Sequence, residues 1–578
     1  MCNLVSAARA LFEVCKAEGV KYAVGVPGSA ALPLFDELYD MQGDITTILA
    51  KHEQTAGFIA DGYARVTGVP CVTVATVGPG AMNLAAGLHC AYQDSFPVLA
   101  VTAQIATKQF GKGGVQEATG WGRTLSHTDA FRPVTKWSVL VERADKLPEV
   151  GMRAFKIMLS GRRGPVHIDV PFDVQKGEVQ FEAYPPEHYR STSGVAGDPA
   201  LVSRAADLLL ESQSPAILAG GGVLASGASP ELLELAEMLV IPVATSAMGK
   251  SCYPEDHPLS LGVAGVYAGH DVANNVLRKD SVDVLLAIGT IFHEVTTRGW
   301  SPDFGGRKII QIDVDPEEIG KNYPIEIGIQ GDAKLVLRQL IEVIKARLTK
   351  PRKYQDSPRV RAIEQAKKDL WFYSPPEMFS DSVPIKPQRA IRELRDFLNR
   401  DAIVLADCGN NLAWTLGHFK NYLPRTFIAD GGHTAMGFSV AAAIGVKLGA
   451  PDKQVVDVIG DGSFMMSNKE VGTARRYNIP VIWFVLDDGQ LGMIKHTQKY
   501  LYDERYIATD SAPSNPDYVK FADAFGVYGE RVEKPGDIKG AFKRAFDSKL
   551  PAILDIIIDP NEVHPKLKAR LEMFRQMK

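Results

Sequence analysis

The fold of this 578-residue chain is decided by the stretch VVDVIGDGSFMMSNKEVGTARRYNIPVIWFVLDDGQLGM, residues 455–493. It opens with an apolar run, residues 455–459, that breaks at Gly460-Asp461-Gly462. Ser463 stands where a helix N-cap is expected, and a helical segment is predicted from there to about Tyr477. A short apolar run, a glycine turn and a helix predict a strand whose carboxyl end leads directly into a helix.

A second apolar run, residues 479–486, ends at Asp487-Asp488-Gly489. Strand, turn, helix and strand make a βαβ unit, so both acidic turns are predicted at one carboxyl edge of a parallel sheet. Two hard carboxylates there can hold a magnesium-type ion, and the N–H groups of the new helix lie beside it. This combination suits a diphosphate. The alternative is an ordinary doubly wound sheet whose turns happen to be acidic.

Composition indicates a large globular enzyme of several domains. A net charge of -4, with 46% hydrophobic and 23% charged residues, gives no reason to expect nucleic acid or a membrane surface as a partner. We expect no signal peptide and no membrane span, and the cytoplasm is the expected location. Six cysteines without a CxxC pair are expected to be reduced, buried and structural: Cys2, Cys15, Cys71, Cys90, Cys252 and Cys408.

The N-terminal part repeats the alternation of strands, glycine turns and helices. A predicted strand at residues 22–26 leads into Gly28-Ser29, and another ends in Glu53. The run at residues 71–88 reads as a strand, the turn Gly78-Pro79-Gly80 and a helix. Such alternation predicts a parallel α/β sheet. Taken alone, Glu53 is interpreted as a solvated residue at the start of a helix. The glycine turn alone is interpreted as a means for a helix to pack closely on a strand.

Several segments together resemble a known superfamily. Gly-Asp-Gly followed, after a spacer, by a paired Asn is the pattern of the thiamine-diphosphate enzymes, although the pair here reads Asp487-Asp488. AKHEQTAGFIADGYARVTG (residues 50–68), TVGPGAMNLAAGL (76–88) and DGGHTAMGFSVAAAIGVKLG (430–449) are similar to the acetolactate synthase branch. Further segments resemble its relative, glyoxylate carboligase. That relative carries an apolar residue where Glu53 stands.

The resemblance implies roles for individual residues. Asp461 and Asp488 would ligate Mg²⁺ with their side chains and Gln490 with its carbonyl, while Glu53 would activate the cofactor at N1′ of its aminopyrimidine ring. Thr434 would offer a carbonyl to the 4′-amino group. Further cofactor contacts are implied at Gly28, Ser29, Pro79, Asn83, Asn410, Asn411, Met436, Gly460, Gly462, Ser463, Leu491, Gly492 and Met493. The alternative for Met436 is that it packs in the core. The alternative for Asn410 and Asn411 is that they are turn residues.

The central part of the chain bears on a second cofactor. In acetolactate synthases this domain binds FAD, which takes no part in the carboligation. A glycine run, residues 220–222, either marks a nucleotide site or allows tight packing. The arginine-bearing GARFDDR segment of the family reads GTIFHEV here, residues 289–295. Both arginines are missing, which argues against FAD.

Departures from the family also concern the substrate. Gln116, Lys136 and Ser29 are expected to line the pocket. Extra residues at about 120–126 are either a surface elaboration or a rim of the pocket that presents Arg123 to an anionic substrate. His127 lies beside this insertion, Val115 replaces the phenylalanine before the Gln, and Thr497 replaces the tryptophan of the synthases.

We therefore predict three doubly wound parallel-sheet domains. They are a pyrimidine-binding domain at 1–175, a central domain at 190–350 and a diphosphate-binding domain at 380–565. Polar, proline-bearing stretches at 176–199 and 350–386 are the predicted linkers.

The predicted function is thiamine-diphosphate- and Mg²⁺-dependent decarboxylation and carboligation of a 2-keto acid. Because Glu53 and Asp461 belong to different domains, the family arrangement places each site between two chains, in a homodimer or homotetramer. Two alternatives stay open. One is a related reaction: glyoxylate carboligation, simple decarboxylation, or acyl transfer to phosphate or coenzyme A. The other is a catalytically silent, nucleotide-binding assembly subunit, against which the intact Glu53, Asp461 and Asp488 argue.

Overall fold

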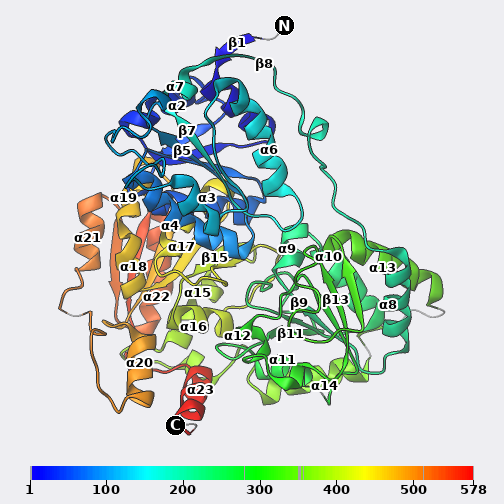
Figure 1. Cartoon of the computed structure of the whole chain (residues 1–578). Helices are drawn as coiled ribbons and strands as arrows, with labels where there is room; N and C mark the ends of the chain where they lie inside the picture. The colour runs from blue at the N-terminus through cyan, green and yellow to red at the C-terminus, as the bar shows by residue number, and fades with distance from the viewer. Residues whose placement is uncertain (1–2, 279, 349–352, 356, 512, 577–578) are drawn as a thin grey trace.

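A computed structural model describes residues 3–278, 280–348, 353–355, 357–511 and 513–576. Three six-stranded sheets, in which every neighbouring pair of strands is parallel, form three α/β units (Figure 1). The unit nearest the N-terminus is blue, the central unit is green, and the third runs from yellow to red. Within the described residues, no helix has the length and hydropathy that a membrane crossing requires.

The first sheet has the order β3–β2–β4–β5–β7–β6. Its strands are β2 (Tyr22–Val26), β3 (Thr46–Leu49), β4 (Cys71–Ala75), β5 (Val98–Gln104), β6 (Ser138–Leu140) and β7 (Val166–Pro171). Its helices are α1 (Ala7–Ala17), α2 (Leu32–Asp40), α3 (Glu53–Thr67), α4 (Pro79–Asp94), α5 (His127–Phe131), α6 (Leu147–Leu159) and α7 (Phe172–Lys176). A separate antiparallel pair joins β1 (Asn3–Ser6) to β8 (Glu178–Phe181).

The central sheet has the order β11–β10–β9–β12–β13–β14. Its strands are β9 (Ala216–Ala219), β10 (Val243–Thr245), β11 (Ser260–Val263), β12 (Val284–Ile288), β13 (Lys308–Asp313) and β14 (Ile327–Gln330). Its helices are α8 (Pro199–Glu211), α9 (Gly221–Ser226), α10 (Ser229–Leu239), α11 (Asp271–Val276), α12 (Glu294–Thr297) and α13 (Ala333–Arg347), and α14 (Pro358–Asp369) follows.

The third sheet has the order β16–β15–β17–β18–β20–β19. Its strands are β15 (Ile403–Ala406), β16 (Phe427–Ala429), β17 (Val455–Gly460), β18 (Ile482–Asp487), β19 (Tyr528–Val532) and β20 (Ala552–Ile557). Its helices are α15 (Pro387–Phe397), α16 (Asn410–His418), α17 (Phe438–Gly449), α18 (Asp461–Ser467), α19 (Val471–Arg476), α20 (Gly492–Leu501), α21 (Tyr518–Phe525), α22 (Ile538–Ser548) and α23 (Pro565–Gln576).

Each sheet contains a central switch point, where the winding direction reverses after the first strands of the unit. It lies between β2 and β4, between β9 and β12, and between β15 and β17. At such a point the loops after two neighbouring strands diverge and leave a crevice at the carboxyl edge. Three of the glycine turns predicted from the sequence follow strands that border a switch point. They are Gly78 after β4, Gly220 after β9 and Gly460 at the end of β17.

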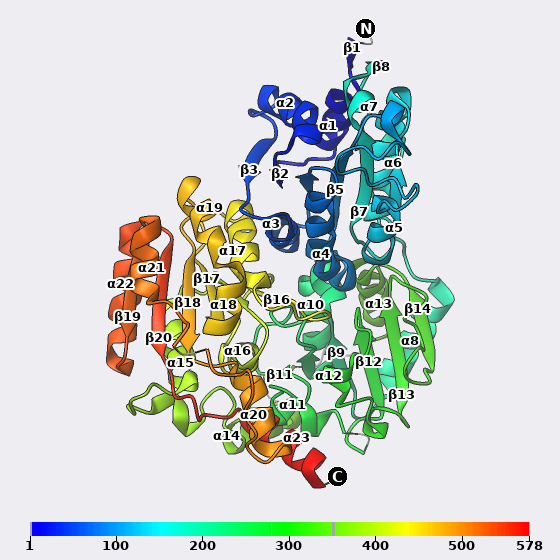
Figure 2. The ribbon, with the colours of Figure 1, turned by 60° about the vertical axis from the view of Figure 1, so that its left-hand side comes forward.

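Helix α3 joins the first unit to the third, because it packs directly on α17 (Figure 2). Both helices are buried along most of their length. The backbones touch at two glycines: a Cβ added at Gly62 would lie 2.1 Å from Ala442 O, and one at Gly445 would lie 1.8 Å from Ile59 O. Only glycine allows so close an approach, so the two units form a tight joint.

The predicted fold class is confirmed, and several local predictions are wrong. Helix α18 begins at Asp461 with Gly460 as its N-cap, so Ser463 lies inside the helix. Glu53 starts α3 instead of ending a strand, because β3 stops at Leu49. The second predicted linker contains α14, whose proline at the first turn reads as a loop signal but is compatible with a helix start.

The domain boundaries stay predictions, although the sheets fall within residues 22–171, 216–330 and 403–557. The end of the predicted central domain and the start of the second linker, residues 349–352, lie outside the described residues, as does Cys2. The other five cysteines are free thiols; four of them are buried, and Cys408 is partly buried.

Candidate active site

Two acidic turns meet at the carboxyl edge of the third sheet. Strands β17 and β18 are paired in parallel with Gly460 opposite Leu486, so the residues after both strands emerge side by side. Asp461 begins α18, and Asp488 directly follows β18. The βαβ geometry expected from the sequence thus places the two carboxyl groups together.

Asp461 is withdrawn from water, and Asp488 is partly buried. Asp461 is 1% exposed and accepts hydrogen bonds from Ser511 Oγ (2.8 Å) and Asn515 Nδ2 (2.6 Å). Burial, together with the neighbouring Asp461, raises the pKa of Asp488 to about 8. Two acids side by side, one buried and one partly buried, disfavour double ionisation unless a cation joins them. The pair therefore has the chemistry of a Mg²⁺ site.

Side chains alone do not complete a metal site. The described residues contain no group of three or more His, Cys, Asp or Glu side chains around one point. A hard cation at Asp461 and Asp488 would need a neutral oxygen as a further ligand, which backbone carbonyls supply. Gln490, the residue expected to give that carbonyl, is buried and held by its side-chain amide, which donates to Pro560 O at 2.8 Å.

Glycines allow neighbouring side chains to pack closely beside the two acids. A Cβ at Gly462 would lie 2.5 Å from Leu491 Cδ2 and 3.7 Å from Met436 Cε. One at Gly492 would lie 2.3 Å from Asp488 Oδ2 and 3.0 Å from Asn410 Nδ2. The predicted cofactor residues of the third unit thus gather around the start of α18. Ser463, two residues into this helix, and Met493, in the first turn of α20, lie beside them in the chain.

The two Asn residues after β15 differ in role. Asn411 is buried and donates from Nδ2 to Asp407 O (2.7 Å) and Val458 O (3.3 Å), so it ties β15 to β17 as a turn residue. Asn410 Nδ2 lies 3.3 Å from His496 Nδ1. Asn410 Oδ1 is buried and has no hydrogen-bond partner among the described residues. Asn410 is therefore the member of the pair with an acceptor left for a ligand.

Glu53 lies at the switch point of the first sheet. It is 9% exposed, and its Oε2 accepts a hydrogen bond from Asn83 Nδ2 at 3.0 Å. A Cβ at Gly80 would lie 3.0 Å from Glu53 Oε1, and one at Gly28 would lie 2.6 Å from Thr76 Oγ1. Thr76 Oγ1 is buried and has no hydrogen-bond partner within the described part of the chain. These surroundings of Glu53 are polar and close-packed, and their unpaired acceptor suits a heterocycle with its own donors and acceptors.

Of the predicted pocket residues, Gln116 adjoins Glu53's surroundings and Lys136 does not. Gln116 has a left-handed backbone (φ 63°), and a Cβ at Gly78 would lie 3.1 Å from it. Ser29 begins a 3₁₀ turn directly after Gly28. Lys136 Nζ donates to Ile157 O, Ser160 O and Arg162 O at 2.6–2.8 Å. Burial lowers its pKa to about 8, and its three donors already serve the end of α6. These contacts do not support the prediction that Lys136 lines the pocket.

Within one chain, Asp461 opens the helical segment 461–470, and the start of α3, which carries Glu53, lies at the other end of that segment. The start of α3 contacts the far end of the segment that Asp461 opens: Lys51 N donates to Glu470 Oε1 at 2.9 Å, and Thr55 Oγ1 to the same oxygen at 2.6 Å. From Asp461 to Glu470 the helical rise is roughly 13 Å at about 1.5 Å per residue. The two groups are therefore not neighbours in the single chain.

Comparison with known proteins identifies the family. Three family models match in the expected order: the N-terminal thiamine pyrophosphate (TPP) binding domain at residues 5–121, the central domain at 202–340 and the C-terminal TPP binding domain at 407–556. The chain is 42% identical over 571 residues to a "Probable acetolactate synthase large subunit" of Methanocaldococcus jannaschii, covering 96% of this chain and 93% of that protein. This chain belongs to the thiamine pyrophosphate enzymes.

Similarity to acetolactate synthases extends over nearly the whole chain. The acetolactate synthase of Arthrospira platensis is 35% identical over 96% of this chain and 95% of its own length. The acetolactate synthase large subunit of Haemophilus influenzae is 34% identical over 97% and 96%. The thiamine pyrophosphate enzyme described here is thus acetolactate synthase-like, as the sequence motifs predict.

This thiamine pyrophosphate enzyme contains a buried ion-pair cluster of Arg65, Asp61 and Asp94, here called the clamp, that the sequence motifs do not identify. Arg65, near the end of α3, pairs with Asp61 and Asp94 at 2.9 Å and donates to Ala429 O at 2.7 Å. Asp94 in turn accepts from the N–H groups of Gly431 and Gly432. The clamp fixes the loop that carries Thr434, whose φ of 54° is strained for a β-branched residue, and Met436.

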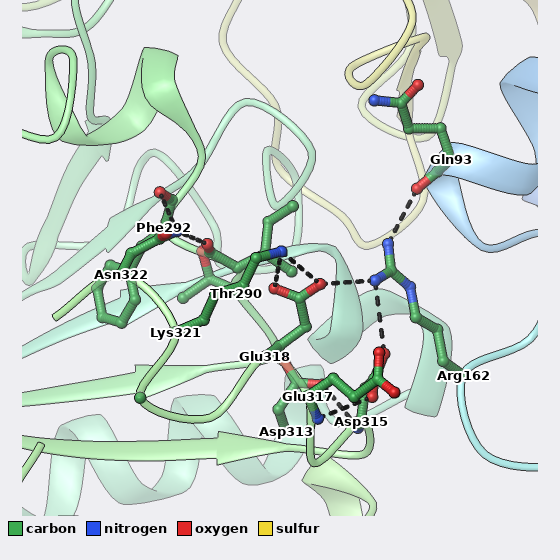
Figure 3. Close-up of polar contacts among 12 residues, drawn as sticks. Gln93, Arg162, Thr290, Phe292, Asp313, Asp315, Glu317, Glu318, Lys321 and Asn322 are labelled. Carbon is green, nitrogen blue, oxygen red and sulfur yellow. Dashed lines mark hydrogen bonds and ion pairs between the residues drawn. The ribbon is translucent and has the colours of Figure 1, made fainter. Parts of the chain in front are cut away.

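At the carboxyl edge of the central sheet, where a nucleotide would be expected, two backbone N–H groups are already engaged in contacts within the domain. Gly220 N donates to Ile288 O and Gly222 N to Gly289 O, so these two N–H groups of the glycine run are used in packing. Asn322 Nδ2 donates to Ile291 O at 2.9 Å and Phe292 O at 3.3 Å (Figure 3).

The segment after β13 is acidic. Arg162, from the first unit, pairs with Glu318 at 2.9 Å and Asp315 at 3.6 Å, and Lys321 lies 3.2 Å from Glu318 (Figure 3). These cations are therefore engaged with carboxylates of the same edge. The pyrophosphate of a flavin dinucleotide needs free N–H groups or arginines, whereas Gly220 N, Gly222 N and Arg162 are already engaged here.

Proposed function

We propose that this chain decarboxylates a pyruvate-type 2-keto acid and joins the remaining carbons to a second carbonyl compound, with thiamine diphosphate and Mg²⁺ bound. The observation that carries the proposal is the pairing of the buried Asp461 with the partly buried Asp488 at the start of α18, beside Gly462 and Gly492. The acetolactate synthase names of the relatives support the choice of reaction.

Asp461, Asp488 and the carbonyl of Gln490 would hold Mg²⁺ and, through it, the diphosphate. The first N–H groups of α18 would meet the diphosphate oxygens. The further residues proposed to border the cofactor are Gly28, Ser29, Pro79, Asn83, Asn410, Thr434, Met436, Gly460, Ser463, Leu491 and Met493.

Thiamine diphosphate, when bound, supplies the electron sink that accepts the electron pair left by decarboxylation. Glu53 would hold the proton that a carboxyl group shares with N1′ of the aminopyrimidine, and Asn83 keeps that carboxyl in place. The Thr434 carbonyl would accept from the 4′-amino group. Gln116 and Ser29 would border the 2-keto acid, since both adjoin the glycine turns beside Glu53.

Each complete site would lie between two chains. Glu53 and Asp461 of one chain are separated by the length of α18 and the turn after it, so Glu53 of one chain would serve Asp461 of a second. A homodimer is the smallest assembly that satisfies this, and a homotetramer contains it twice.

The enzyme would work without flavin. Ile291 and Val295 cannot replace two guanidinium groups, and a charge-assisted hydrogen bond is worth about 1.5–3 kcal/mol, so the loss of two weakens binding by several powers of ten. We expect the purified protein to show no flavin absorbance near about 450 nm, a property of the cofactor itself. Stoichiometric absorbance there would contradict this part of the proposal.

Product analysis tests the reaction. The purified chain, with Mg²⁺ and thiamine diphosphate, is incubated with a panel of 2-keto acids, and carbon dioxide and organic products are identified by mass spectrometry. We expect carbon dioxide together with a carboligation product. Carbon dioxide with a free aldehyde alone would assign a simple decarboxylase, and no turnover of any 2-keto acid would overturn the proposal.

A further inference from the structure

A buried histidine lies below the glycine turn of the first unit. His127, the first residue of α5, is fully buried. Its Nε2 lies 3.0 Å from Gly78 N, which donates to it, and its Nδ1 lies 3.0 Å from Asp169 Oδ1. Because Gly78 N–H can only donate, Nε2 is the acceptor and Nδ1 carries the hydrogen that Asp169 accepts. The imidazole is thus fixed in one tautomer.

Asp169 is itself held firmly. Thr102 Oγ1 donates to its Oδ1 at 2.6 Å and Gln104 Nε2 to its Oδ2 at 3.1 Å. Gln104 also pairs with both the N–H and the carbonyl of Ala118. These residues lie on β5 and β7, in the middle of the sheet. The cluster therefore ties the segment of residues 111–127 to the sheet at two points, Ala118 and His127.

The turn that His127 supports lies between two proposed site residues. Gly78 has φ 71° and ψ −113°, and its Cα faces Gln116 so closely that a Cβ would lie 3.1 Å from Gln116 Cβ and O. Two residues further on, Gly80 borders Glu53 Oε1 in the same way. A shift of this turn therefore moves the surroundings of both Gln116 and Glu53.

We propose that His127 is a positioning residue of this enzyme: its imidazole, oriented by Asp169, holds the Gly78 turn and with it the environment of Glu53 and Gln116. The segment of residues 111–127 is accordingly part of the active-site framework and not a surface elaboration. This inference rests on the proposed function of Glu53 in cofactor activation.

A pair of variants separates the two hydrogen bonds of the ring. In His127→Asn the side-chain amide reaches the position of Nδ1 and keeps the bond to Asp169, but the Gly78 N–H loses its acceptor. In His127→Gln the amide oxygen reaches the position of Nε2 and keeps the bond to Gly78. Ser138→Ala is the matched control, because it removes a 2.8 Å contact to the buried His167 ring of the same cluster without touching His127.

The measurement is hydrogen–deuterium exchange at C2 of thiamine diphosphate bound with Mg²⁺ to each variant. Calorimetric binding of the same cofactor and thermal unfolding serve as independent readouts. We expect His127→Asn to slow exchange at least about tenfold, since a buried N–H is left without a partner. His127→Gln should recover most of this loss. Cofactor affinity should stay within about threefold in both variants, because the metal-binding end of the site is untouched.

Two results would overturn the inference: equal slowing by the Asn and Gln variants, or unchanged exchange in His127→Asn. If the Asn variant does not fold, folded His127→Gln decides alone, since lost exchange there contradicts the role assigned to the Gly78 contact. Ser138→Ala should shift only the unfolding temperature. Failure of the proposed function is seen separately, as absence of C2 exchange in the unmodified enzyme.

Discussion

At the scale of a single residue, Glu53 has surroundings that suit its proposed role in proton sharing. Its carboxyl group is 9% exposed, one oxygen accepts a hydrogen bond from Asn83, and the other faces the bare Cα of Gly80. A solvated helix start, the alternative reading of this residue, would leave the carboxylate in water. Burial with one oxygen open to a ligand is instead typical of an acid–base group.

Glu53→Gln should keep the fold and nearly abolish cofactor activation. The amide is nearly isosteric but cannot exchange the proton, and removal of a positioned acid–base group costs about 10²–10⁴-fold in rate. Exchange of the C2 hydrogen of bound thiamine diphosphate, followed by NMR in deuterium oxide, measures this directly. Unchanged exchange in the cofactor-loaded variant would remove Glu53 from its assigned role.

Variants of the acidic pair should differ from each other. Asp461→Ala removes a carboxylate that Ser511 and Asn515 hold in place, and it should abolish Mg²⁺-dependent cofactor binding. Asp488→Asn keeps an oxygen ligand and should still bind, because amide carbonyls can ligate hard cations. Calorimetric titration with thiamine diphosphate and Mg²⁺ distinguishes the two. Normal binding by Asp461→Ala would place the metal elsewhere.

At the scale of single elements, backbone contact governs how helices pack. The contact of α3 with α17 depends on glycines where the helices cross. Such contacts are sensitive to a single added carbon atom, because neither backbone can move without displacing its own sheet.

Gly445→Ala tests this contact. The new Cβ would lie 1.8 Å from Ile59 O and 2.8 Å from Tyr63 N, so the helices must separate. Overpacking of this kind costs about 1–3 kcal/mol, which urea unfolding detects. Gly43→Ala is the control, since nothing lies within 4 Å of its added Cβ. Equal stability of both variants would contradict the assigned tightness of the joint.

The sequence predicts some elements well and others poorly, for physical reasons. Strand β2 was predicted with its observed bounds, and β17 to within one residue, because short apolar runs end at glycine turns. The Asp461–Asp488 pair followed from βαβ geometry. The start of α18 was misplaced because Asp461 already begins the helix.

Three-dimensional contacts account for what the sequence did not reveal. Lys136 was predicted to line the pocket, yet its Nζ donates to carbonyls at the end of α6, which is distant in the sequence. His127 and Arg65 act through partners 40 or more positions away, namely Gly78 and Asp169 for the former and Ala429 for the latter. No local pattern marks such pairings.

For the whole molecule, the separation of Glu53 from Asp461 within a chain supports the proposal that each site is shared between two chains. Two inactive variants should then complement each other. A mixture of Glu53→Gln and Asp461→Ala chains, co-expressed with different tags, forms mixed dimers in which one of two sites has both native residues. Random pairing would recover about a quarter of the unmodified activity. Activity no higher than that of the separate variants would place each site within one chain.

The joint between α3 and α17 also limits how the chain can be divided. Residues 438–446 of α17 are all buried, and most of α3 is buried as well, so neither helix has a polar face to show to water. A fragment that ends before the third unit would leave α3 uncovered, and one that starts after the first would leave α17 uncovered. Both fragments would aggregate when made alone. Evolutionary reshuffling of these units must therefore move the first and the third unit together.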